Sequence, residues 1–461
     1  MDTTVKPVQT DATAEHGITF REAFWVWVRV ALQSFGGPAG QIAVMHRILV
    51  EEKRWVSENR FLHALNYCML LPGPEAQQLA TYIGWLLHRT KGGLTAGLLF
   101  VLPGFLSILA LSVVYALYQN VSAVEAVFFG LKAAVLAVVV EAVLKIGKRA
   151  LKNRVMVALA MLAFVAIFFF NVPFPLIVLS AALIGFVGSR LAPELFYVIK
   201  GHAVSGQDEG GYAITDAVAA RIRPSNGTAL RTLLLWGSVW LVPLALLYLL
   251  LGGEDTFTQI GTFFSQAALV TFGGAYSVLA YVAQEAVNTY GWLRPGEMLD
   301  GLGLAETTPG PLIQVVQFVG FLGAYRDPGV LSPLIAGVLG SVLTSWVTFA
   351  PCFLWIFLGA PYIEYLRGNR VLSSALSGIT AAVVGVILNL AVWFGLHVIF
   401  GVVNEQQMGP LRLYIPAWPT LDVAALVLSI VSFVALFRLK VGMLPTLALS
   451  AGLGLIYRLV F

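Results

Sequence analysis

The chain has 461 residues, of which 58% are hydrophobic and only 11% are charged. A soluble protein carries about a quarter of its residues as charged side chains, so this composition excludes a soluble globular fold. The formal net charge of +4 says little about partners, because basic residues in a membrane protein mark its topology. We predict an all-α polytopic membrane protein. The apolar runs that reach the ~20 residues needed to cross a bilayer are 93–117, 124–144, 232–252, 332–360 and 373–400.

Polar segments lie at the N-terminus and between the apolar spans, and the two cysteines lie within apolar segments. Residues 1–17 lack an apolar core and are not expected to form a cleavable signal peptide. Cys68 and Cys352 both lie in apolar segments, so we expect packed thiols rather than a disulfide or a metal site. The polar stretch 191–230 is expected to be a flexible cytoplasmic connector, followed by the span 231–252.

Basic residues indicate the orientation. The loop 145–154, KIGKRALKNR, is taken as cytoplasmic under the positive-inside rule. Most of the 28 Lys and Arg residues then face the cytoplasm, and two, Arg29 and Lys132, lie within apolar segments. We therefore predict a multi-pass protein of the inner (cytoplasmic) membrane with a cytoplasmic N-terminus. The basic residues expected outside are Arg294, Arg326, Arg412 and Arg458.

Two apolar regions contain an unusual break. Residues 70–80 read LLPGPEAQQLA, and residues 307–317 read TTPGPLIQVVQ. An unpaired backbone amide or carbonyl is costly in lipid, so Pro-Gly-Pro is tolerated there only where protein buries it or it faces a water-filled cavity. Pro74 and Pro311 suit the first position of a new helix, because that amide needs no intrahelical partner. Each break is therefore predicted to be a hairpin tip that opens a half-helix, whose free amides and dipole favour an anion.

A glycine pair precedes each break. The stretch 34–40 reads SFGGPAG, and 271–277 reads TFGGAYS. Glycine accepts positive φ and lets a ligand approach the backbone closely. The alternative interpretation is a set of Pro-kinked helices whose glycines serve close packing. The glycines concerned are Gly36, Gly37, Gly273 and Gly274.

The motifs recur because the two halves are copies. Residues 34–77 align without a gap with 271–314, and LPGFLSI at 102–108 matches APCFLWI at 350–356. A single span between the copies would give them opposite orientations, as in transporters where one repeat rocks against the other. The predicted division is an N-terminal repeat 18–190, a linker with a connecting transmembrane helix 191–254, and an inverted C-terminal repeat 255–461.

Inversion of the repeats is expected to bring the tips together near the membrane midplane. Several helix starts around one point favour a small, compact anion such as a tetrahedral oxyanion. We therefore predict re-entrant or broken helices around a central anion site.

Four polar side chains are candidates for the site. Gln77 and Gln314 recur at equivalent places and are expected either to donate to an oxyanion or to form interhelical hydrogen bonds. A charge such as Lys132 costs at least ~2.5 kcal/mol in the middle of a membrane helix. It is therefore expected to bind the anion, to extend its charged end toward the membrane interface, or to form a structural pair, with Glu141 as one candidate partner. Arg29 is expected to neutralise or gate the substrate, or to stabilise the bundle.

Two carboxylates lie nearest the breaks, Glu75 and Glu306. An ionised carboxylate repels an anion and a protonated one tolerates it, so their titration is a route to proton coupling. The alternative is that Glu75 caps the new helix start and stays ionised. His63 and Asp300 occupy equivalent positions in the copies and are interpreted as interfacial residues.

Several other function classes lack their motifs. No GxxxxGK[ST] phosphate loop is present, so an ATP-driven pump is not expected. No HExxH motif, clustered His/Cys spacing or convincing nucleophile–base pair occurs. We therefore predict no enzyme, no catalytic residues, no metal, no cofactor and no nucleic-acid partner.

The paired motifs resemble a known family. FGGP…W…PGPEAQQLATYIG in the first copy and FGGA…W…TPGP in the second are similar to the chromate ion transporter family, in its long-chain form with two homologous halves. The resemblance spans nearly the whole chain. It implies export of chromate from the cytoplasm, chromate resistance, drive by the proton-motive force, and sulfate as a chemical mimic. Ala275 replaces Pro38 and Leu312 replaces Glu75 in the second copy, so the halves need not contribute equally.

The expected function is secondary active transport of chromate across the lipid bilayer. A sulfate or other oxyanion carrier and a passive anion channel are the alternatives, and a homodimer is a candidate assembly. Gating or proton coupling is assigned to Arg29, Glu75 and Glu306. The predicted substrate-binding residues are Gly36, Gly37, Pro72, Gly73, Pro74, Gln77, Lys132, Gly273, Gly274, Pro309, Gly310, Pro311 and Gln314.

Overall fold

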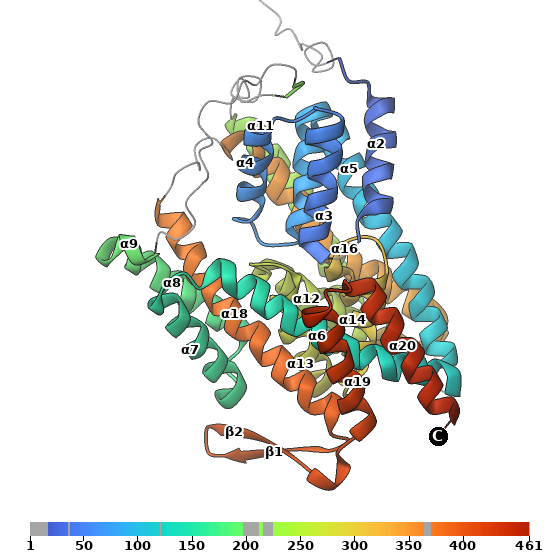
Figure 1. Ribbon diagram of the computed structural model, residues 1–461. Coiled ribbons are helices and arrows are strands. Elements are labelled where there is room, and N and C mark those ends of the chain that lie inside the picture. The colour runs from blue at the N-terminus through green and yellow to red at the C-terminus, as the bar shows by residue number, and fades with distance from the viewer. Residues whose placement is uncertain are drawn as a thin grey trace, which may run out of the picture.

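The computed structural model describes residues 17–35, 37–119, 121–196, 212–214, 225–363 and 370–460. The described chain is predominantly helical, which confirms the predicted all-α membrane fold (Figure 1). The predicted binding residue Gly36 lies outside the described residues, as do residues 1–16 and most of the connector 191–230.

The first copy opens with short helices and continues with long ones. A short helix, α9 (Pro193–Phe196), follows it, and α11 (Asn226–Leu251) connects it to the second copy. The elements of the first copy are α2 (Phe20–Gln33), α3 (Gly37–His46), η1 (Arg47–Glu52), α4 (Glu58–Cys68), α5 (Glu75–Tyr118), α6 (Ser122–Ala150), α7 (Arg154–Phe170) and α8 (Phe174–Leu191).

The second copy repeats this order. A π-helical turn follows the second short helix in both copies, as η1 and η2, and the long helices recur at equivalent places, which confirms the two-repeat organisation. Its helical elements are α12 (Thr256–Val270), α13 (Ala275–Gln284), η2 (Glu285–Thr289), α14 (Glu297–Thr307), η3 (Leu312–Gln314), α15 (Val315–Arg326), α16 (Pro333–Gly359), η4 (Ala360–Tyr362), α18 (Arg370–Ile399), η5 (Trp418–Thr420), α19 (Val423–Phe433), η6 (Val434–Arg438) and α20 (Met443–Val460).

The described residues contain seven helices that are long and apolar enough to cross a membrane. Five of them cover the apolar runs that the sequence predicts as spans, to within one residue at the ends of each run, so those predictions are confirmed. The seven are Glu75–Tyr118, Ser122–Ala150, Phe174–Leu191, Asn226–Leu251, Pro333–Tyr362, Val371–Ile399 and Met443–Val460.

Other helices are too short to cross. The helices α3 and α13 have 10 residues each, and α4 and α14 have 11, against the ~20 that a full crossing needs. The long helix α5 is broken, because His88 and Arg89 leave helical geometry inside it. In the second copy the equivalent break separates α15 from α16. Each copy therefore contains the broken helices that the sequence predicts.

The long helices of the two copies interlock. The first copy's α6 packs on the second copy's α20, while α18 packs on α8. A β-carbon on Gly130 of α6 would lie 2.0 Å from the carbonyl oxygen of Ser450 in α20. A β-carbon on Gly378 of α18 would lie 2.5 Å from the carbonyl oxygen of Ala181 in α8. Small residues thus allow close backbone contact in both helix pairs. The long helices of each copy therefore pack against long helices of the other.

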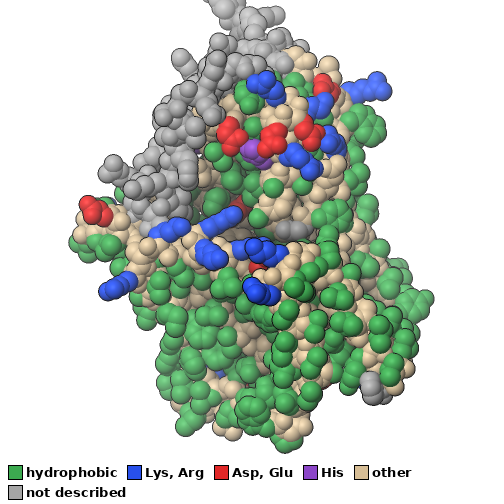
Figure 2. All heavy atoms as spheres, viewed as in Figure 1, with side chains coloured by type: hydrophobic (Ala, Val, Ile, Leu, Met, Phe, Trp, Pro, Cys, Tyr) green, Lys and Arg blue, Asp and Glu red, His purple; other side chains and the backbone are tan. Residues whose placement is uncertain are grey.

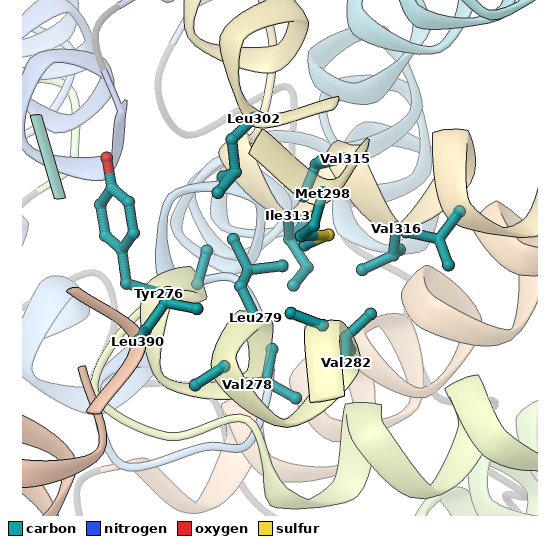
Figure 3. Packing of buried hydrophobic residues seen from close by; sticks show 14 of the residues in the cluster. Tyr276, Val278, Leu279, Val282, Met298, Leu302, Ile313, Val315, Val316 and Leu390 are labelled. Carbon is teal, nitrogen blue, oxygen red and sulfur yellow. The ribbon is translucent and has the colours of Figure 1, made fainter. Parts of the chain in front are cut away.

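The two copies contribute unequally to the hydrophobic core. The short helices α12 to α15 share one core with the long helices α6, α7, α8 and α18. Figure 3 shows part of this core, in which Leu279 of α13 and Met298 of α14 lie close to Ile313 of η3. The short helices α2 to α4 form a separate core with the first part of α5 and with Phe353 and Ile356 of α16.

A β-hairpin is the main departure from the predicted all-α chain. Strands β1 (Val403–Met408) and β2 (Leu411–Pro416) pair antiparallel at the end of the molecule opposite α2 to α4 (Figure 1). Arg412, predicted only as an outside charge, is 3% exposed and donates from Nη2 to the carbonyl oxygen of Ile167 at 2.9 Å. The hairpin therefore caps the C-terminal carbonyls of α7, as a basic side chain near a helix end can do.

Candidate functional site

The glycine loops and the Pro-Gly-Pro tips meet across the two copies. The amide of Gly73 donates to the carbonyl oxygen of Thr271 at 2.8 Å. The amide of Gly310 donates to the carbonyl oxygen of Ser34 at 2.9 Å. Gly73 aligns with Gly310 and Ser34 with Thr271, so the two hydrogen bonds are equivalent and exchanged between the copies. We call these two joined pairs of loops the crossing.

The long helices support the tips from behind. Gly73 has φ 124° and Gly310 has φ 101°, which only glycine adopts without strain. A β-carbon on Gly310 would lie 2.9 Å from Cα of Gly104 in α5, and one on Gly73 would lie 2.8 Å from Sγ of Cys352 in α16. Gly104 and Cys352 are themselves equivalent in the copies. Cys68 and Cys352 are both buried and free, which confirms the predicted packed thiols.

Helices begin at all four tips, one residue later than predicted at the Pro-Gly-Pro sites. Pro74 and Pro311 are N-caps with extended backbone, so α5 begins at Glu75 and η3 at Leu312. The correction follows from ψ values of 106° and 132° at the two prolines, which lie outside the helical region. The glycine loops open α3 and α13, and Gly274 caps α13 with φ 99°. The first amides of these helices have no intrahelical acceptor, which favours an anion.

The two repeated glutamines use their donors inside the protein. The Nε2 atom of Gln77 donates to Oγ1 of Thr81 at 3.1 Å, and Nε2 of Gln314 donates to Oγ of Ser345 in α16 at 3.0 Å. The Oε1 atom of each glutamine is buried and has no partner in the described parts of the chain. For Gln314 this geometry is the interhelical bond that the sequence allows. Donation to an oxyanion remains a prediction for both residues.

The two candidate carboxylates differ in their surroundings. Glu306, at the end of α14, is 2% exposed and accepts a hydrogen bond at Oε1 from the hydroxyl of Tyr276. Its Oε2 atom lacks a partner among the described residues. Glu75 is partly exposed, and the charge of Arg149 on α6 acts on it. The charges of Glu141 and Lys145 on α6 act in turn on Glu306, so one face of α6 lies opposite both carboxylates.

Lys132 and Arg29 both form ion pairs with carboxylates of the protein. The Nζ atom of Lys132 is 3.3 Å from Oδ2 of Asp300 on α14. The suggested pair with Glu141 is therefore wrong, because Glu141 instead pairs with Lys145 one turn further along α6 at 2.8 Å. Arg29 pairs with Glu52 at 2.7 Å, and its side chain is 45% exposed. The structure thus gives both basic residues protein partners.

The crossing is enclosed unevenly. Every residue of α14 from Glu297 to Glu306 is buried, and Ala280 of α13 is 0% exposed. The equivalent residue of α3, Ala43, is exposed, and so is Ala39 one turn earlier. Figure 2 shows this open face, where the surface is hollowed below the part of the molecule that holds α3 and α4, and Lys and Arg side chains form a row beside the hollow.

Sequence reasoning missed two polar contacts at the crossing. Gln41 of α3 donates from Nε2 to the carbonyl oxygen of Gly310 at 2.6 Å, and Tyr276 of α13 binds Glu306. Neither side chain recurs in the other copy, where Val278 and Ala39 stand at these places. A search for repeated residues therefore passes over them. Only their position in the first two turns of the glycine-loop helices was a signal.

The chain matches the sequence profile of the family described as Chromate transporter, over residues 21–186 and 258–455. It is similar to the chromate transport protein of Pseudomonas aeruginosa, with 31% identity over 82% of each chain. It is also similar to the chromate transport protein of Cupriavidus metallidurans, with 28% identity over 83% of this chain and 85% of the relative. The probable chromate transport protein of Synechococcus elongatus is 29% identical over 80% and 83% of the two chains. No solved structure shows a significant match.

Proposed function

The chain belongs to the chromate transporter family, and from this premise we propose that it is a secondary active transporter that exports chromate from the cytoplasm. The proton-motive force drives the export, and the consequence for the cell is chromate resistance. The relatives named as chromate transport proteins support the substrate class. The multi-pass helical fold supports a carrier in a membrane.

The crossing is the observation that carries this proposal. Its two equivalent hydrogen bonds, Gly73 to Thr271 and Gly310 to Ser34, set four helix starts into two joined pairs. Amides and dipoles at helix starts stabilise a dianion without supplying a fixed counter-charge. A site of this kind binds chromate and can also release it, as transport requires.

Movement of the substrate follows from the uneven enclosure of the crossing. In an inverted-repeat transporter the two copies exchange roles, so that the site opens first to one side and then to the other. The hollow beside α3 and α4 is the open side in this conformation, and α13 with α14 forms the closed side. Lys145 and Arg149 belong to the segment 145–154 that is predicted to be cytoplasmic, and they lie in the last turns of α6, which extends to Ala150. We therefore assign the open side to the cytoplasm of the inner membrane, with the N-terminus on that side.

Glu306 and Glu75 are the groups assigned to proton coupling. A neutral Glu306 accommodates a dianion at the neighbouring tip, whereas an ionised one repels it. Glu306 is buried, and its Oε2 atom has no hydrogen-bond partner among the described residues, which suits a carboxyl that binds and releases a proton. Arg29 and Glu52, which pair at the exposed edge of α2, are assigned to gating rather than to substrate contact.

Two other functions are outcomes of the same test. Sulfate has the charge and shape of chromate, and backbone amides do not separate the two, so a sulfate carrier is the first alternative. A passive anion channel is the second.

Uptake of labelled chromate by inverted vesicles that contain the protein distinguishes these functions. It is measured with and without a protonophore and with excess sulfate. We expect uptake above empty vesicles that collapses with the protonophore. Flux that only equilibrates would favour a channel, and absence of flux would remove the substrate assignment.

A further inference from the structure

An ion pair joins α14 of the second copy to the long helix α6. The Nζ atom of Lys132 lies 3.3 Å from Oδ2 of Asp300, and the hydroxyl of Tyr115 on α5 donates to the same oxygen at 2.9 Å. The side chain of Asp300 is 3% exposed and that of Lys132 is 31% exposed. Three helices therefore meet on one buried carboxylate.

Asp300 is held more loosely than its neighbour Glu297. Both oxygens of Glu297 accept from the guanidinium of Arg326 at 2.7 Å, and Oε2 also accepts from the amide of Arg294. The Oδ1 atom of Asp300 has no hydrogen-bond partner in the described part of the chain. The charged groups around Asp300 are Lys132 of α6, Glu297 of α14 and, through Glu297, Arg326 of α15. Its attachment to α6 thus depends on one cation.

The exposure of Lys132 indicates where water reaches this pair. An ammonium group facing acyl chains is strongly disfavoured, so a lysine that is about one-third exposed within a membrane helix lies toward water or lipid headgroups. Asp300 lies on the sealed side of the same contact. The pair therefore marks the boundary between the closed interface of α6 with α14 and an aqueous approach to it.

The first copy has no equivalent pair. His63 stands at the place of Asp300, and Thr380 stands at the place of Lys132. The hydroxyl of Thr380 donates to the carbonyl oxygen of Leu376 within α18. A threonine carries no charge, so these two residues do not form an ion pair with each other. Of the two equivalent pairs of positions, the one that joins α14 to α6 therefore has this ion pair and the one at His63 and Thr380 does not.

We propose that Asp300, Lys132 and Tyr115 form a latch that holds α13 and α14 against α6 and keeps the crossing closed on that side. The latch rests on the alternating access of the proposed function. Removing either charge removes the attraction between α14 and α6. The hairpin of α13 and α14 then separates from α6, and α3 with α4 closes over the opposite side.

Two reporter cysteines test this latch, Ala43→Cys on α3 and Ala280→Cys on α13. They occupy equivalent positions, one exposed and one buried. The full-length protein is placed in lipid nanodiscs and labelled with a charged, membrane-impermeant thiol reagent, and the parent with its two buried cysteines gives the background. In the presence of Asp300→Asn we expect at least fivefold faster labelling at position 280 and slower labelling at position 43. Glu125→Gln, at an exposed pair with Arg458 at 3.9 Å, is the matched control and should change neither rate.

Charge exchange separates a latch from a structural pair. The double variant Lys132→Asp with Asp300→Lys restores the attraction, so both labelling rates should return toward those of the parent. Unchanged rates in Asp300→Asn would overturn the latch. Faster labelling at both positions that the exchange does not reverse would also overturn it, because the pair would then serve only folding. Labelling does not require transport, so a protein that shows the opposite changes at 43 and 280 but no chromate flux would retain the latch and lose the substrate assignment.

Discussion

The hairpin of α3 and α4 and the hairpin of α13 and α14 follow one sequence plan and pack differently. The first belongs to a core of its own with α2, α5 and α16, and leaves Ala39 and Ala43 exposed. The second is buried in the core of the long helices. Equal sequence plans with unequal packing are what a two-state carrier shows when one of its states is seen. The difference in burial between the two hairpins is what the proposed exchange of roles between the copies requires.

The largest expected effect comes from closing the space at one tip. Gly310→Ala adds a β-carbon 2.9 Å from Cα of Gly104, at a φ of 101° that costs about 1–3 kcal/mol for a side chain. We expect chromate flux to fall by more than tenfold, together with the yield of folded protein. Gly329→Ala is the control, since its φ is also positive but its surroundings are open. Equal flux in the two variants would show that the crossing is not tightly packed.

A smaller effect is expected from neutralising the buried carboxylate of the closed copy. Glu306→Gln keeps the size of the side chain and removes its charge, so proton-driven accumulation should be lost while chromate–chromate exchange persists. Tyr276→Phe removes one hydrogen bond to Glu306, worth about 1 kcal/mol, and should slow accumulation by less than tenfold. Accumulation and exchange are measured in the same vesicles. Accumulation that survives in Glu306→Gln would remove this residue from the coupling.

The next largest effect is expected from removing the hydrogen bond of Gln41, which the equivalent residue Val278 cannot form. Gln41→Val copies the residue at the equivalent place, Val278, and deletes the bond to the carbonyl oxygen of Gly310. The loss of a buried hydrogen bond should lower the free energy of unfolding by about 1–3 kcal/mol. Denaturation in detergent measures it, with Ile42→Val, a partly exposed neighbour, as control. Identical midpoints for the two variants would mean that Gln41 does not hold the first copy to the second.

The smallest effect should come from the exposed edge of α2. The pair of Arg29 and Glu52 is about half exposed, and such pairs contribute at most about 1 kcal/mol. Arg29→Gln should therefore change chromate flux by no more than about twofold, consistent with a minor gating role. Flux reduced by an order of magnitude, with normal folding, would place Arg29 in contact with the substrate path.

The sequence predicted the parts of the fold that depend on local pattern. The apolar spans, the repeat and the breaks at Pro-Gly-Pro could be recognised from composition and from the recurrence of motifs. Five of the observed spans cover the predicted runs to within one residue at the ends of each run. The helix starts at the Pro-Gly-Pro tips were predicted one residue too early. The N-cap position depends on the ψ angle of the proline rather than on residue type alone. The β-hairpin was missed because its short strands lie within a chain read as helical throughout.

The ion-pair and hydrogen-bond partners of the polar side chains were harder to predict than the positions of the helices. Lys132 was expected to meet Glu141 or the substrate, yet it pairs with Asp300, which is distant in sequence. The glutamine amides near the tips were expected either to donate to an anion or to form interhelical hydrogen bonds, and in this conformation they bind Thr81 and Ser345. A single sequence also holds no signal for which copy is closed, because that is set by the relative free energies of two packings of the same chain.

The exchange of roles between the copies is the central claim, and spin-label distances test it directly. One pair of labels spans the open side, at Ala43 of α3 and Lys148 of α6, and the other spans the closed side, at Thr289 of η2 and Glu125 of α6. All four positions are exposed. With chromate present, a fraction of molecules should show a shorter distance for the first pair and a longer one for the second. Distances that stay fixed in both pairs, or that change in the same direction, would contradict alternating access by exchange of the two copies.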